Sequence, residues 1–255
     1  MQGEAAFQES RDAIMQNGLY VALSGQVSMQ RRLETIANNV ANMNTVGYRA
    51  DSVRFEQQVA KAGDNELSYV TGGSDFISKK AGPLIRTESR FDVAIQGDGW
   101  FAVNQGGQTI YTRDGRFQLS ETGNLINVNG AQVVDAGGAP VQLDPSGGPP
   151  AISGDGMITQ NGRQTGAIGL FQLDGSAALT RAGSSGFTSD QPGVAVLDFT
   201  QNSIVQGAIE GANVNPIEEM TKLIALTRNF DNVANEITKS ETSLTDAIKA
   251  LGSSA

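Results

Sequence analysis

Glycine and proline are distributed unevenly along this chain of 255 residues. All 7 prolines lie between Pro83 and Pro216, and of the 31 glycines only 4 precede residue 51 and only 1 follows residue 216. Both residue types are unfavourable inside helices and common in turns. The distribution therefore predicts a helix at each end of the chain and a β-rich body between them.

The N-terminal end carries apolar residues at alternating steps of three and four. This spacing places them on one narrow face of a helix, as in the seam of a coiled coil, with one polar exception. The helix is expected to end at Gly47, because glycine readily adopts the left-handed conformation that closes a helix. The positions are Leu19, Ala22, Gln26, Met29, Leu33, Ile36, Val40 and Met43.

The C-terminal end repeats an apolar residue at every seventh position. Asn215 and Pro216 are suited to the N-cap and the first helical position, and two glutamates follow in the first turn. We expect a helix from about Pro216 to Ala250. Its apolar positions are Leu223, Phe230, Ile237, Leu244 and Leu251.

Two arrangements would satisfy these apolar stripes. They can cover an ordinary core, as in most helices, or the two ends can pack with each other and then with other copies or partners. The second is favoured because the stripes are narrow and flank a body of different character. We expect an α+β fold in which N- and C-terminal helices form a coiled-coil-like α domain beside a central antiparallel β-rich domain. The expected divisions are an N-terminal extension (1–14), an N-terminal assembly helix (15–50), an extended connection (51–85), the β domain (86–205) and a C-terminal assembly helix (206–255).

Hairpin signals recur through the centre of the chain. Asp114-Gly115 and Asn129-Gly130 separate short runs rich in β-branched and aromatic residues. Such dipeptides at intervals of roughly 8–12 residues indicate antiparallel strands joined by tight turns.

Composition excludes several functions. The chain has no His and no Cys, which removes disulfides, thiolate nucleophiles, imidazole catalysis and Cys/His zinc sites. The net charge of -9 argues against binding to nucleic acid, and no apolar run is long enough for membrane insertion. Asp98, Asp114 and Asp155 each precede a glycine, but they lack the ligand spacing of a calcium loop and are typical of turns. We expect no enzyme activity, no cofactor and no metal.

Three blocks of sequence resemble one known family. Residues 37–49 (ANNVANMNTVGYR), the central segments 92–103 and 111–117, and residues 207–220 (GAIEGANVNPIEEM) are similar to the blocks shared by the rod, hook and hook-associated subunits of the bacterial flagellum. The blocks occur in the order typical of that family and span about residues 15–251. Chain length and the modest central domain resemble rod subunits, and residues 15–20 resemble proximal-rod subunits most. A distal-rod or hook subunit is the alternative, although those usually carry a Gln-Arg-Ala-Tyr-Glu type segment where this chain has residues 227–231 as TRNFD.

The resemblance implies a structural subunit that polymerises through its terminal helices into a tubular drive shaft. Its partners would be other copies, other rod subunits and, during secretion, the flagellar export apparatus. Residues 1–14 lack the basic and apolar regions of a secretory signal. We therefore expect export without a cleaved signal peptide to the basal-body rod, which spans the periplasm.

The assembly interface is expected on the apolar stripes, at Leu19, Met29, Leu33, Ile36, Val40, Leu223, Phe230, Ile237, Leu244 and Leu251. Asn38, Asn39 and Asn42 are expected to join helix surfaces or the turn through amide hydrogen bonds, the alternative being an exposed helix face and its C-cap. A secreted β-rich adhesin or carbohydrate-binding module with helical ends is a hypothesis of a different class. It predicts exposed Trp100 or Tyr111, whereas a rod subunit would bury Trp100 in its core.

Overall fold

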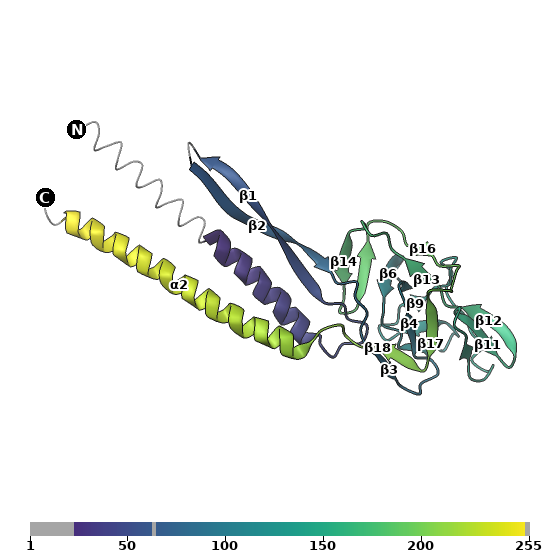
Figure 1. The fold of residues 1–255 in the computed structure, drawn as a ribbon. Coiled ribbons are helices and arrows are strands. Elements are labelled where there is room, and N and C mark those ends of the chain that lie inside the picture. Colours follow the sequence, from purple (N-terminus) through teal and green to yellow (C-terminus); the bar gives the residue numbers. More distant parts are fainter. Residues whose placement is uncertain (1–22, 63–64, 253–255) are drawn as a thin grey trace. The chain divides into compact units, whose positions relative to one another are not determined.

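The computed structural model describes residues 23–62 and 65–252, and the chain divides into two compact units (Figure 1). The helical unit contains the described parts of Met1–Val40, Asp51–Phe76 and Asn215–Ala255. The β body contains Ala41–Ala50 and Ile77–Val214. Each unit is therefore built from segments that are far apart in the sequence.

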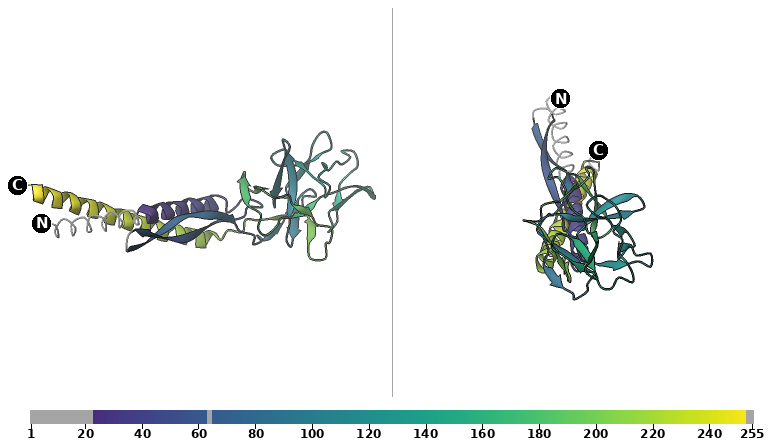
Figure 2. Two further views of the ribbon diagram at one scale, coloured as in Figure 1. Left: turned by 90° about the horizontal axis from the view of Figure 1, so that it is seen from above. Right: turned by 90° about the vertical axis from the view of Figure 1, so that its right-hand side faces the viewer.

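The helical unit consists of two helices and a long β-hairpin. The N-terminal helix is described over residues 23–41, and α2 comprises Pro216–Gly252. Asn215 Oδ1 lies 3.2 Å from the Ile217 amide, which donates to it, so the expected N-cap is present. Strands β1 (Asp51–Ala62) and β2 (Asn65–Ile77) pair as a two-stranded ribbon (Figure 2).

The α+β content agrees with the prediction, but the coiled-coil-like α domain is wrong. A coiled coil buries its seam residues in the facing helix. The described seam side chains are all only half-buried: Met29, Leu33, Ile36, Val40, Leu223, Phe230 and Ile237. The repeat failed as a predictor because its period shows only that a helix has one apolar face. It does not show that the other helix of the same chain covers that face.

The β body is made of short strands, as its turn-rich sequence predicts. Their bounds are β3 (Leu84–Arg86), β4 (Val93–Gln96), β5 (Trp100–Gln105), β6 (Gln108–Thr112), β7 (Phe117–Leu119), β8 (Leu125–Asn127), β9 (Gln132–Val133), β10 (Ala151–Ile152), β11 (Met157–Gln160), β12 (Arg163–Ala167), β13 (Leu170–Gln172), β14 (Leu179–Ala182), β15 (Gly186–Ser189), β16 (Val194–Ala195), β17 (Ser203–Gln206) and β18 (Ala208–Glu210).

One nine-stranded sheet dominates the β body. Its main path runs β14-β15-β6-β5-β9-β8-β7, and β13 joins it by pairing with both β5 and β16. The assigned pairings of this sheet are antiparallel. Three smaller sheets, β10-β11-β12, β17-β4 and β18-β3, complete the body. In the last two, β17 lies just before the C-terminal block and β18 lies inside it, and each pairs with a strand more than a hundred residues earlier.

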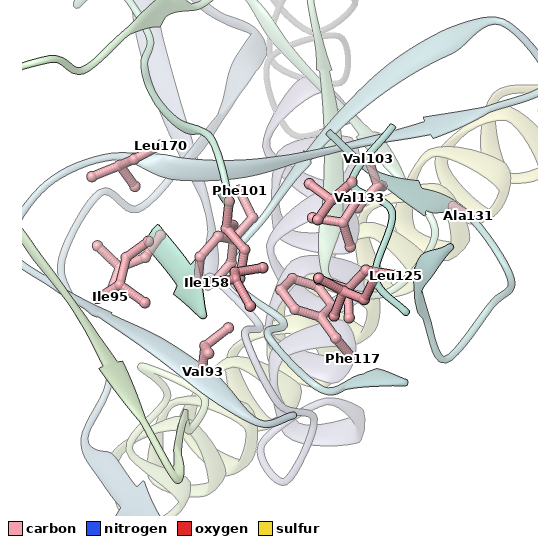
Figure 3. Close-up of a cluster of buried hydrophobic side chains, with 14 residues drawn as sticks. Val93, Ile95, Phe101, Val103, Phe117, Leu125, Ala131, Val133, Ile158 and Leu170 are labelled. Atoms are coloured by element: carbon pink, nitrogen blue, oxygen red, sulfur yellow. The ribbon is translucent and has the colours of Figure 1, made fainter. Parts of the chain in front are cut away.

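Strand β5 separates two apolar clusters. Successive side chains of a strand point to opposite faces. Accordingly, Phe101 and Val103 belong to the larger cluster (Figure 3), whereas Trp100 and Ala102 belong to the smaller one. The larger cluster also contains Val93, Ile95, Phe117, Leu125, Ala131, Val133, Val141, Leu143, Ile158, Ile168, Leu170 and Ile204, and the smaller also contains Tyr111, Val134, Phe171 and Phe187.

Candidate functional site

The residues predicted for the assembly interface lie mainly on the two helices. Leu19 lies outside the described residues, and Leu244 and Leu251 lie on α2 with side chains outside the described part. Neighbouring apolar side chains are still more exposed than the predicted seam: Leu23 is 52% exposed, Ile224 55% and Ile217 79%. Both helices therefore present apolar surface that the described part of the single chain leaves uncovered.

The three predicted asparagines have different surroundings. Asn39 is buried: its Nδ2 donates to the Asp51 carbonyl at 2.9 Å, and its Oδ1 accepts from the Asp51 amide at 2.9 Å. Asn39 Nδ2 also lies 3.3 Å from Glu219 Oε2, so this side chain joins the N-terminal helix to β1 and α2. Asn42 is half-buried and accepts at Oδ1 from the Thr45 hydroxyl at 3.2 Å, while Asn38 is exposed.

The turn that follows the N-terminal helix is built into the β body. Gly47 has a φ of 70°, and its amide donates to the Glu210 carbonyl at 2.7 Å. A Cβ at Gly47 would lie 2.3 Å from the Asp114 amide nitrogen. Only glycine fits here, because the left-handed conformation and the close approach of backbone both exclude a side chain. The N-terminal, central and C-terminal sequence blocks thus meet at this turn.

A buried charge cluster lies beside that turn. Arg49 Nη2 is 2.7 Å from Glu210 Oε1, and Arg113 Nη1 is 2.9 Å from Glu210 Oε2. All three side chains are buried: Arg49 and Glu210 are each 1% exposed, and Arg113 is 3% exposed. Glu210 also accepts from the Gly82 amide at 2.9 Å. One carboxylate therefore binds two guanidinium groups and a backbone amide, and the cluster carries one net positive charge.

Burial acts on the arginines of this cluster. Desolvation lowers the pKa of Arg49 to about 10, although Glu210 opposes the shift. The pKa of Arg113 is also lowered by burial, and Glu210 again opposes the change. Both guanidinium groups still carry their charge at neutral pH, so Glu210 is needed to balance them.

Trp100 lies next to the cluster. The guanidinium carbons of Arg49 and Arg113 are 5.5 and 5.4 Å from its ring centre, within the range of cation–π attraction. Trp100 is only 7% exposed, and Tyr111 is buried as well. The adhesin hypothesis required these aromatic side chains to be exposed for stacking on a soluble ligand. Because both are buried, they are not available for it.

The described ranges contain no group of three His, Cys, Asp or Glu side chains close enough together to hold a metal ion. Among the described helices, none combines the length and apolar character needed to cross a membrane. The geometry is that of a structural junction, with charges used to bind chain segments together.

Comparison with known proteins agrees with this division into blocks. Residues 19–49 match the flagella basal body rod protein family, and residues 205–250 match the flagellar basal body rod FlgEFG protein C-terminal family. Residues 94–160, between them, match the flagellar hook protein FlgE/F/G D1 domain.

Whole-length relatives decide the family. The flagellar basal-body rod protein FlgF of Mesorhizobium japonicum is 46% identical over 94% of this chain and 99% of its own length. This chain belongs to the flagellar basal-body rod protein family. FlgF of Rhizobium meliloti is also 46% identical, over 94% of this chain and 100% of its own length. FlgG of Bacillus subtilis is 30% identical over 92% and 98%. The prediction of a flagellar rod subunit is confirmed, with strong similarity to proteins named FlgF.

The junction residues of this rod protein were not predicted as site residues. Arg49, Arg113 and Glu210 all lie inside the sequence blocks that carry the family resemblance. Arg49 and Glu210 are charged residues among mostly apolar and small residues, and this was the one feature of the sequence that could have indicated a special role. It could not reveal the partners, because Arg49 and Glu210 are brought together only by the fold.

Proposed function

We propose that this rod subunit belongs to the proximal rod and that its terminal helices pack against copies of itself and against other rod subunits. The resulting tube would be the drive shaft of the flagellum. The observation that carries the proposal is the apolar surface of the two helices. It includes half-buried positions at steps of seven on α2 and exposed positions such as Ile224.

Helices of this kind depend on packing. Most of the stability of a protein helix comes from burial of its apolar face, and isolated helices are marginal in water. Because the described residues leave both apolar faces partly exposed, neighbouring subunits are the natural cover. A contact between unlike surfaces that does not close into a ring generates a helical filament. This is the symmetry that a tubular rod requires.

The proximal position rests on the degree of similarity to relatives. Identity is 46% to two proteins named FlgF and 30% to the FlgG of Bacillus subtilis. We therefore propose the proximal rod, which is the position of FlgF in the family that the sequence resembles, with a distal-rod or hook subunit as the alternative. The proposal gives the chain a structural role and no catalytic one.

We also propose that the subunit passes through the flagellar export apparatus without cleavage and that the rod it joins crosses the periplasm. The support is its membership in a family of basal-body rod proteins. Mass spectrometry of the subunit from purified basal bodies should find the same N-terminus as in the cytoplasmic pool. A processed N-terminus in basal bodies would contradict this route.

The assembly role is tested by Ile237→Asp, which places a charge on the half-buried face of α2. Cells carrying only this variant should fail to swim in soft agar and should yield basal bodies without a complete rod. Asn235→Asp is the matched control, because Asn235 is exposed on the same helix and the new charge is the same. Circular dichroism should show a folded β body in both variants. Motile cells with normal rods in the Ile237→Asp strain would refute helix-mediated assembly.

A further inference from the structure

The chain passes between the two units four times, after Val40, Ala50, Phe76 and Val214. At each passage the chain leaves one unit and enters the other. Asn213 stands next to the last of these passages. The hydrogen bonds of Asn213 described below all join residues of the β body.

Asn213 binds the segments beside two other passages. Its Oδ1 accepts from the Ala50 amide at 2.7 Å. Its Nδ2 donates to Ser78 Oγ at 3.1 Å and to the Lys80 carbonyl at 2.7 Å. Its own backbone amide lies 3.2 Å from the Tyr48 carbonyl. The side-chain amide thus uses its acceptor and its donor group at once.

A further hydrogen bond closes this arrangement. The Ser78 amide donates to the Ala50 carbonyl at 2.9 Å. Residues 48–50, residues 78–80 and Asn213 are therefore tied to one another in pairs, and Asn213 contributes to two of the three pairings. We call these residues the joint.

We propose that Asn213 is the positioning residue of the joint, holding together the β-body segments beside three of the four passages. The β-body ends of these three chain segments are then held together by hydrogen bonds within the β body. The asparagine amide suits this position because it accepts from Ala50 and donates to the Lys80 carbonyl at once; an aspartate could accept from Ala50 and from the Ser78 hydroxyl but could not donate to Lys80. The joint is a feature of the single chain, so this inference stands apart from the assembly role.

Hydrogen exchange of the purified full chain tests the joint directly. Asn213→Ala removes all three side-chain hydrogen bonds of the joint and should speed exchange of the Ala50 and Ser78 amides about tenfold or more. Asn213→Asp loses the bond to the Lys80 carbonyl and places a carboxylate against it, and should speed exchange of the same amides by a smaller factor. Amides of β5, in the core, should keep their protection. Asn129→Asp is the matched control, because Asn129 is exposed in a turn of the same β body, and it should change neither set.

A milder variant keeps the test decisive. Ser78→Ala removes one acceptor of the Asn213 amide and should speed exchange of the same joint amides about threefold, again without effect on β5. Unchanged exchange of Ala50 and Ser78 in both Asn213 variants would overturn the proposal. Equal loss of protection in the joint and in β5, in Asn213→Asp and Ser78→Ala alike, would also overturn it. That outcome would make Asn213 a part of the general core.

Discussion

Removing the charge of Glu210 should destabilise the β body more than removing any exposed carboxylate. Glu210→Gln keeps the shape of the side chain but removes the carboxylate that pairs with Arg49 and Arg113, leaving only the weaker attraction of Asp98. Charge centres about 4 Å apart interact by about 4 kcal/mol at an effective dielectric constant near 20. Hydrogen bonds to the new amide offset part of this loss. We expect the free energy of unfolding to fall by about 3–5 kcal/mol, as for other buried pairs that lose one partner.

The single tryptophan makes the assay specific. Trp100 lies 5.5 and 5.4 Å from the two guanidinium carbons, so its fluorescence during urea unfolding reports on this cluster. Glu121→Gln, in an exposed turn of the same body, is the control and should change stability by less than about 0.5 kcal/mol. If Glu210→Gln falls within about 1 kcal/mol of that control, the charge cluster does not stabilise the fold and the reasoning fails.

A double-mutant cycle separates lost attraction from other effects. Arg49→Met alone removes one buried cation and leaves Glu210 paired with Arg113. If the two charges act on each other, Arg49→Met combined with Glu210→Gln should be less destabilised than the sum of the single variants. The expected coupling is about 1–3 kcal/mol. Strict additivity would show that the pair does not interact.

Three further changes probe the turns and the core. Gly47→Ala should lower the free energy of unfolding by about 2–4 kcal/mol in urea titrations, since the left-handed conformation and the backbone clash both oppose a side chain. Tyr111→Phe removes the hydroxyl that accepts from the Gly193 amide at 2.7 Å and should cost about 1–2 kcal/mol in the same assay. The Ser176 hydroxyl, followed by the Ser176 amide, lowers the pKa of Asp174. Ser176→Ala should raise that pKa in an NMR titration. Because the folded-state pKa is depressed, the stabilisation is present above the unfolded-state pKa and is lost as the pH falls through the folded-state value.

The sequence was informative where local chemistry decides structure. Asn215 and Pro216 set the start of α2, and the crowding of glycine in the centre predicted a body of short strands. Both follow from backbone preferences that act over a few residues. The coiled-coil prediction failed because it required knowledge of what covers a helix face. That depends on tertiary and quaternary contacts, which a repeat of seven does not contain.

The charge cluster shows a second limit. Arg49 and Glu210 are separated by most of the chain, and neither the composition nor the spacing indicates that they meet. The absence of His and Cys excludes disulfides, imidazole and thiolate catalysis and Cys/His zinc sites. This inference is of a different kind, because it depends on composition and needs no knowledge of the fold. Buried Arg and Glu are rare unless they are paired, so only the fold could show that these charged residues belong to the interior.

The two units differ in where they place some of their charged and apolar side chains. The β body buries four charged side chains, whereas the described helices expose Leu23, Ile217 and Ile224. The buried charges are Arg49, Arg113, Asp114 and Glu210. Each of these buried charges has an oppositely charged partner within the β body, so their pairing does not depend on another subunit. Helices with uncovered apolar faces are stabilised when a partner arrives. Under the proposed helix-mediated assembly, this difference would let the β body keep its own internal contacts whether or not the helices have met a neighbour.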